Sequence, residues 1–175
     1  MNLTRRTVLT GLMLSPALAL GLSANDEALL SLEVLMFNQT GPKPNSPKVP
    51  PLELPDFPQS LARVERKTQG LALTAAAHAL ARQGYDKLGH YLWWLHTPAN
   101  ARIGLKLEDN KVQLACQLQR GQTLMLDFKA WVRQEGNQGY AINELRRIKF
   151  TETHYFDHPQ WGAIVQVRNH QSDES

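Results

Sequence analysis

Residues 123–132 read TLMLDFKAWV, and apolar side chains occupy every second position of this stretch. Alternation with a period of two is typical of a β-strand that buries one face. Moving outward, Gly121 and the tripeptide 108–110 mark tight turns on the N-terminal side. Further short apolar runs that we interpret as strands lie at 29–37, 85–95, 103–107, 112–118 and 163–167. Short strands joined by tight turns predict one antiparallel sheet of about six to seven strands.

The pattern changes between residues 60 and 83, where apolar residues recur at spacings of three and four. The run 75–81 is rich in alanine and leucine, which favour helix, and Gly84 is a natural stop. Gly70 divides this region, so we expect one or two helices packed on one face of the sheet. The predicted fold class is therefore α+β.

The first 24 residues have the layout of an export signal. Arg5 and Arg6 precede an apolar run over 8–22, and small residues follow. This run is shorter than the roughly 20 residues that span a bilayer, so we expect no transmembrane segment in the mature protein. The string 4–9 resembles a twin-arginine motif, and both the Tat and the Sec route remain open. We predict a periplasmic protein with a single domain over 25–168 and a polar tail at 169–175.

Charge and cysteine content narrow the function classes. The chain has 175 residues and a formal net charge of +3, but removing Arg5 and Arg6 leaves 17 basic against 16 acidic side chains. A balance so close to neutral argues against a nucleic-acid partner. Cys116 is the only cysteine, which excludes an intramolecular disulfide, and its place in an alternating run predicts burial.

Seven of the ten prolines fall between Pro42 and Pro58. Proline fixes its own backbone and lacks an amide donor, so 42–58 is predicted to be an extended loop that wraps the surface.

Residues 144–159 read ELRRIKFTETHYFDHP and combine cations, acids, histidines and aromatics. We interpret 145–155 as a strand, which places Arg146, Glu152 and His154 on one face together with apolar residues. Charged groups there must pair with one another or meet a ligand, because an unpaired buried charge is costly. The candidate ligand-binding residues are Arg146, Arg147, Glu152, His154, Tyr155, Asp157, His158 and Trp161.

Two other interpretations of this motif remain open. His154, His158, Asp157 and Glu152 have the chemistry of zinc ligands and suggest a metal-dependent hydrolase. Pro159 disfavours the helix that a His-x-x-x-His zinc motif uses, so we predict no metal, no cofactor and no enzymatic activity. Alternatively, Arg146, Glu152, His154 and Asp157 form an ionic network that only locks a corner of the fold.

The motif resembles the C-terminal signature of the CsiV family, whose members are described as periplasmic, peptidoglycan-binding and involved in cell-shape integrity. The residues that carry the likeness are Arg146-Arg147, Glu152, His154-Tyr155 and Asp157-His158-Pro159, followed by Gly162 and an apolar strand. A weaker likeness in the same order covers an early Glu-Val strand at 33–37, the Ala/Leu helix, and Gly84-Tyr85 with His90 and Trp93 or Trp94 leading to Pro98. The chain departs from the pattern at Ile148-Lys149, Phe156 and Trp161.

The resemblance implies a binding or adaptor protein for the cell wall. It also implies a partner, an outer-membrane lipoprotein that activates a class A penicillin-binding synthase. Aromatic side chains offer flat faces for sugar rings, and the cations Arg146, Arg147 and Lys149 suit the carboxylates of peptide stems. The aromatics considered are Trp93, Trp94, Trp131, Tyr155, Phe156 and Trp161, of which we expect at least half to be buried in the core.

Overall fold

A computed structural model of the chain describes residues 27–39, 45, 47–53, 64–98, 100–134 and 137–170. The predicted export signal over 1–24 lies outside these residues. Within the described part, the chain forms nine strands and one helix. In chain order these are β1 (Ala28–Asn38), β2 (Val64–Lys67), α1 (Thr74–Arg82), β3 (Lys87–Thr97), β4 (Arg102–Glu108), β5 (Val112–Arg120), β6 (Leu124–Arg133), β7 (Gly139–Ile148), β8 (Thr153–His158) and β9 (Trp161–Asn169).

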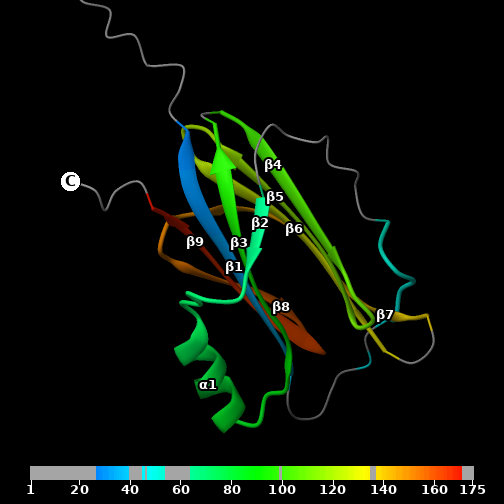
Figure 1. Cartoon of the computed structure of the whole chain (residues 1–175). Helices are drawn as coiled ribbons and strands as arrows, with labels where there is room; N and C mark the ends of the chain where they lie inside the picture. Colours follow the sequence, from blue (N-terminus) through cyan, green and yellow to red (C-terminus); the bar gives the residue numbers. More distant parts are fainter. Residues whose placement is uncertain are drawn as a thin grey trace, which may run out of the picture.

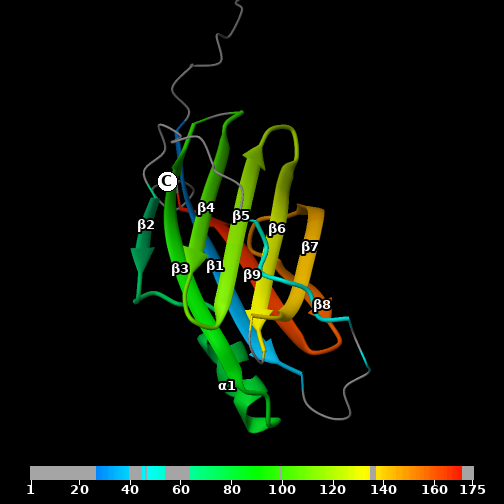
Figure 2. The same ribbon diagram turned by 90° about the vertical axis from the view of Figure 1, so that its right-hand side faces the viewer.

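The strands form two antiparallel sheets that face each other (Figures 1 and 2). The first, sheet A, has the order β2-β3-β1-β9-β8, and the second, sheet B, has the order β4-β5-β6-β7. Antiparallel pairing and the α+β class are confirmed, whereas the prediction of one sheet is wrong. Alternation reports that a strand has a buried face, but it does not say which strands share a sheet.

The main core lies between the two sheets. Leu32 and Val34 of β1 and Leu126 and Phe128 of β6 are fully buried within it. The ring of Phe128 stacks on that of Phe156 from β8, the edge strand of sheet A, with centroids 4.4 Å apart, so the two sheets are in direct contact there. Cys116 belongs to the same core, which confirms its predicted burial.

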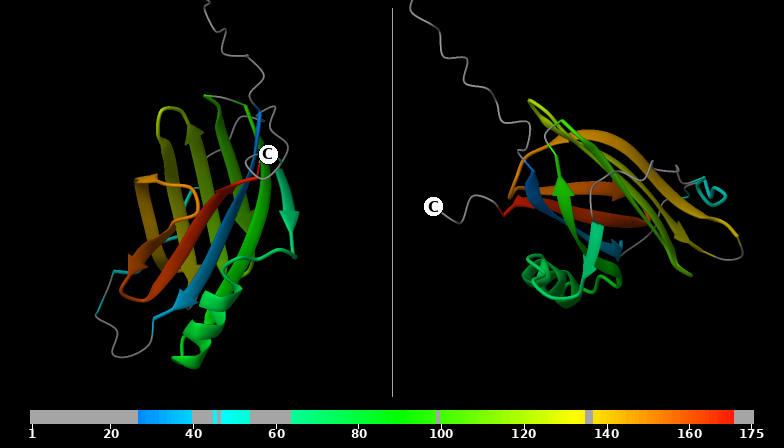
Figure 3. Two further views of the ribbon diagram at one scale, coloured as in Figure 1. Left: turned by 90° about the vertical axis from the view of Figure 1, so that its left-hand side faces the viewer. Right: turned by 45° about the horizontal axis from the view of Figure 1, so that its top comes forward.

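The helix covers the outer face of sheet A, on the side away from sheet B (Figure 3). Strand β1 is therefore buried on both faces: Leu35 and Phe37 pack against Leu73 at the start of α1. The helix is shorter than the predicted 60–83, because Val64–Lys67 pair with β3 as an edge strand instead. Gly70, with a φ of +80°, lies between the two elements and allows the chain to turn.

A carboxylate from sheet A binds the backbone at the start of the helix. Glu33 of β1 is 2% exposed and accepts hydrogen bonds from the backbone N–H groups of Ala72 (2.8 Å) and Leu73 (2.9 Å). His90 of β3 contacts the same carboxylate through Nε2 at 2.7 Å. The first amides of a helix lack partners within the helix, so Glu33 stabilises both the helix start and its position on the sheet.

The described part of the proline-rich segment, residues 47–53, lies against sheet B (Figure 2). Val49 forms a β-bridge with Gly139, and its carbonyl oxygen accepts a hydrogen bond from Trp131 Nε1 at 3.2 Å. The Leu52 N–H donates to Gln113 Oε1 at 3.0 Å. These contacts hold residues 47–53 on the surface of sheet B, and Trp131 is buried beneath them.

The first two residues of the predicted polar tail at 169–175 are held against sheet A. Asn169 is the last residue of β9, and the ring of His170 lies 4.3 Å from that of Trp94. Residues 171–175 lie outside the described part of the chain. None of the helical segments that the structure describes has the length and apolarity needed to cross a bilayer.

Candidate functional site

The predicted strand over 145–155 is two strands that belong to different sheets. β7 ends at Ile148 in sheet B, and β8 begins at Thr153 in sheet A. Thr151 lies in the turn between them and has a φ of +65°. Residues other than glycine rarely adopt this left-handed backbone conformation. The expectation that Arg146, Glu152 and His154 share one strand face is therefore wrong, because the chain changes sheet between them.

Arg146 connects the edges of the two sheets across this turn. Its guanidinium donates to the backbone carbonyl of Tyr155 at 2.6 Å and forms an ion pair with Glu144 on its own strand. The same group lies 4.4 Å from the centre of the Phe156 ring, which is within cation–π range. The contacts with Tyr155 and Phe156 hold β7 and β8 together, and the ion pair with Glu144 orients the guanidinium.

His154 and Glu152 hold the turn itself. The backbone N–H of Lys149 donates to His154 Nε2 at 3.1 Å, and the Lys149 ammonium pairs with Glu152 at 3.0 Å. Thr151 is fixed from β9, since its N–H donates to the Val167 carbonyl and its own carbonyl accepts from the Gln166 side chain. The predicted network of Arg146, Glu152, His154 and Asp157 is thus replaced by separate local contacts with other partners.

Tyr155 and Asp157 lie together on the outer face of β8. The Tyr155 hydroxyl donates to Asp157 Oδ1 at 3.0 Å, and the Gln39 amide donates to both groups at 2.8 Å. The Tyr155 ring lies nearly parallel to that of Phe37, with centroids 6.1 Å apart, and remains 44% exposed. Burial of the hydroxyl and the neighbouring Asp157 carboxylate raise the pKa of Tyr155 to about 12. This cluster presents an aromatic ring, a carboxylate and an amide to solvent.

His158 at the end of β8 pairs with Trp161 at the start of β9, and both side chains pack toward the core. The ring of His158 lies 5.2 Å from that of Tyr140, and its Nδ1 accepts the backbone N–H of Gln160. Burial lowers the pKa of His158, and the Asp157 carboxylate opposes this shift. Trp161 is fully buried and donates from Nε1 to the Tyr140 carbonyl at 3.1 Å. This corrects the expectation that Trp161 presents a stacking face to a ligand.

The other candidate aromatic side chains also differ in how deeply they are buried. Trp93 and Phe156 are buried with Trp131 and Trp161, while Trp94 is half-buried and Tyr155 is exposed. The prediction that at least half of them belong to the core is confirmed. Among these six aromatic candidates, Tyr155 is therefore the exposed one.

The four residues considered as zinc ligands do not converge. Asp157 binds Gln39 and Tyr155 on the outer face of β8, whereas His154 contacts the β7–β8 turn. Glu152 is paired with Lys149, and His158 stacks against Tyr140. Among the residues that the structure describes, no group of three or more histidine, cysteine or acidic side chains is arranged to hold a metal ion.

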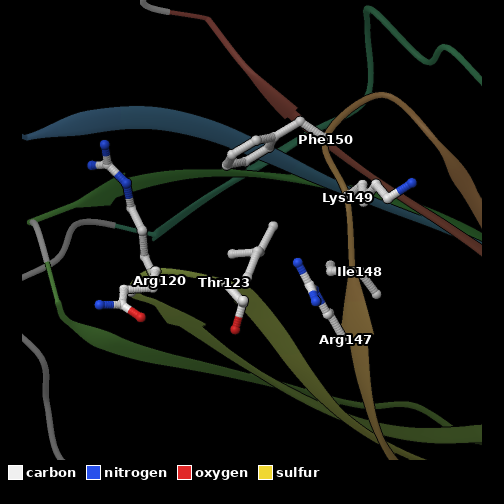
Figure 4. A pocket seen from close by; sticks show the side chains of 9 residues that line it. Arg120, Thr123, Arg147, Ile148, Lys149 and Phe150 are labelled. Carbon is white, nitrogen blue, oxygen red and sulfur yellow. The ribbon is translucent and has the colours of Figure 1, made fainter.

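The side chain of Arg147 lies apart from the other candidate residues of the motif, on a cavity of about 380 Å³ at the end of sheet B. Figure 4 shows its side chain directed toward Thr123 in the turn after β5, with Arg120 on the far side of that turn. Lys149 and Phe150 complete the lining from the β7–β8 turn. Sequence reasoning missed Arg120, which is placed opposite Arg147 by the pairing of β6 with β5 and β7.

The motif and this cavity lie within a segment that is similar to a known family. A family model described as "Peptidoglycan-binding protein, CsiV" matches residues 94–170. The matched segment begins in β3 and contains all of sheet B together with β8 and β9. No curated protein and no solved structure matches the chain. Over residues 94–170 the chain is thus similar to the CsiV peptidoglycan-binding family, which confirms the resemblance found in its sequence.

Proposed function

We propose that this protein binds peptidoglycan and that the exposed cluster of Tyr155, Asp157 and Gln39 contacts the glycan. The observation that carries the proposal is the match of residues 94–170 to a peptidoglycan-binding family. Tyr155 and Asp157 lie in this segment, and Gln39 joins them from the end of β1. Sugar rings stack on aromatic faces, while carboxylates and amides bind their hydroxyl groups.

The geometry of the cluster supports this use. The Phe37 ring stacks on Tyr155 and Tyr85 packs edge-on against Phe37, so the Tyr155 ring has support from behind. The two hydrogen bonds from Gln39 restrict the Tyr155 hydroxyl and the Asp157 carboxylate. A binding surface fixed in this way loses little conformational entropy when a ligand arrives.

The proposal includes the place and partners of the protein. An export signal over 1–24 would deliver the chain to the periplasm, where peptidoglycan lies. There the protein would act without catalysis as an adaptor that supports cell-wall synthesis and cell shape, through a lipoprotein activator of a class A penicillin-binding synthase. Co-purification of that lipoprotein with the chain from detergent extracts tests the partner independently of sugar binding, and an extract in which the chain is recovered without the lipoprotein would exclude the contact.

Sedimentation with purified sacculi tests peptidoglycan binding itself. Wild-type protein should pellet with the sacculi, and Tyr155→Ala should pellet less because the stacking ring is gone. Leu145→Ala is the matched control: Leu145 is the other large exposed apolar side chain of the described residues, 70% exposed on β7. Protein that stays soluble at both low and high salt would exclude peptidoglycan binding. Equal losses for both variants would exclude the Tyr155 cluster as the contact surface.

A further inference from the structure

We infer that the cavity beside Arg147 is a carboxylate-binding subsite that holds a peptide stem of peptidoglycan. The inference rests on the proposed function and adds to it a second contact region with its own chemistry. The cavity lies between the turn that joins β5 to β6 and the end of β7. Its volume of about 380 Å³ falls within the range of small-ligand sites, which is about 300 to 1,000 Å³.

The charged side chains of the cavity all have one sign. Arg120, Arg147 and Lys149 line it, and none of its lining residues is acidic. Glu152 lies nearby and pairs with Lys149 at 3.0 Å. The side chain of Arg147 makes no hydrogen bond or ion pair with any residue that the structure describes, so its guanidinium is available to a ligand.

The position of Arg147 is determined by strand register. Arg147 pairs with Met125 of β6, and the neighbouring Ile148 pairs with Leu124. Leu124 pairs in turn with Arg120 at the end of β5. Because these pairings set the two arginines on either side of the turn at 121–123, the cavity is built on strand ends rather than on a long loop (Figure 4).

The remaining walls favour a carboxylate attached to an aliphatic group. Ile148 and Leu124 are buried at the cavity floor, and Phe150 is half-buried beside them. A guanidinium binds a carboxylate through two parallel hydrogen bonds, and adjacent apolar walls accommodate methyl and methylene groups. Short peptides that end in small aliphatic amino acids carry both features.

The cavity and the Tyr155 cluster belong to different strands and different sheets. Arg147 is on β7 of sheet B, whereas Tyr155 is on the outer face of β8 in sheet A. The cavity is therefore assigned to the peptide part of the ligand and the Tyr155 cluster to its sugar part. Two linked contacts of this kind raise the overall affinity through effective concentration.

The test is an NMR titration of ¹⁵N-labelled protein with three ligands: a soluble muropeptide, the same muropeptide with amidated carboxylates, and its disaccharide without peptide. The free muropeptide should shift the amide signals of Gly121 and Arg147, and the disaccharide should not. Loss of a charged hydrogen bond should weaken binding by roughly 10- to 100-fold, both for the amidated ligand and for Arg147→Gln. Acetate should compete more strongly than phosphate at equal ionic strength.

Lys111→Gln is the charge-matched control. Lys111 is exposed at the opposite end of sheet B and lines a cavity of about 330 Å³ there, so its loss removes one positive charge without touching the Arg147 cavity. Equal affinity of the amidated muropeptide, wild-type affinity of Arg147→Gln, or stronger competition by phosphate would overturn the carboxylate subsite. If the wild-type protein still sediments with sacculi in that case, the carboxylate subsite is refuted and peptidoglycan binding is retained. If the protein binds neither sacculi nor muropeptide, the proposed function fails with it.

Discussion

Arg146 on β7 donates a hydrogen bond of 2.6 Å to the backbone carbonyl of Tyr155 on β8, which joins the edges of the two sheets. The same guanidinium covers the ring of Phe156, which stacks on Phe128 in the core. One side chain thus links the β7–β8 corner to the centre of the fold. This places Arg146 in the structural part of the motif, while its neighbour Arg147 faces a cavity.

Arg146→Ala should lower the free energy of unfolding by about 1 to 3 kcal/mol, because it removes a charged hydrogen bond and a cation–π contact. Urea denaturation followed by circular dichroism measures the change. Arg147→Ala is the control and should change the free energy of unfolding by less than about 0.5 kcal/mol, as expected for an exposed surface residue. Equal stabilities of the two variants would contradict the structural role of Arg146.

Glu33→Ala should lower the free energy of unfolding more than Glu27→Ala does. It leaves the Ala72 and Leu73 amides and the His90 ring without their buried partner, and a buried polar group left unsatisfied costs about 1 to 3 kcal/mol. Glu27→Ala is the control, since Glu27 also lies near a histidine but at 3.8 Å and 58% exposed. Thermal melts measure both effects, and hydrogen exchange at Ala72 and Leu73 should accelerate in Glu33→Ala alone. Unchanged exchange there would mean that the helix start does not depend on Glu33.

The strands with clear alternation were predictable, and the junctions between sheets were not. Residues 123–132 are apolar at every second position, and β6 occupies almost the same range. The segment 149–152 lacks glycine, proline and asparagine, and Thr151 takes the left-handed conformation that glycine or asparagine usually marks. No residue in the sequence therefore marks the end of β7, and the alternation predicts a single strand over 145–155.

The sequence predicted several residues of the candidate site, but it did not predict which of them lie together in the fold. The sequence identified Tyr155 and Asp157, yet it placed neither beside Gln39, which is more than a hundred residues away along the chain. Arg120 lies opposite Arg147 only because β6 pairs with both β5 and β7. Contacts of this kind depend on strand register, which a single sequence leaves open.

Gly139→Ala should destabilise the fold by about 1 to 3 kcal/mol, the usual cost of an overpacked site. A Cβ atom at Gly139 would lie 2.3 Å from the Val132 carbonyl oxygen and 2.5 Å from the Trp131 ring, so the backbone or the indole must move. Gly121→Ala is the control, because the nearest atom to its Cβ is 3.9 Å away. Differential scanning calorimetry compares the two. If Gly139→Ala and Gly121→Ala melt at the same temperature, the backbone and the Trp131 ring can move to accommodate the added Cβ atom without loss of stability.

Alkaline pH should report the contact between Tyr155 and Asp157. The pKa of Tyr155 is raised from 10 to about 12, first by burial and then by Asp157. Between these values an unfolded chain loses the phenol proton while the folded protein keeps it, so this contribution to stability is complete below pH 10 and is lost as pH rises toward 12. Asp157→Asn should lower the Tyr155 pKa part of the way toward 10, because burial remains.

Ultraviolet absorbance of the phenolate measures this titration, and Tyr155→Phe identifies the signal. Tyr91 provides the internal control, since its pKa is also raised to about 12, by burial and by Asp109. Asp109→Asn should therefore move the Tyr91 titration and leave that of Tyr155 in place. If Asp157→Asn leaves the Tyr155 titration where it is in the wild type, the hydrogen bond between the two residues does not persist in solution. The ring and the carboxylate would then reach a ligand independently rather than as one fixed surface.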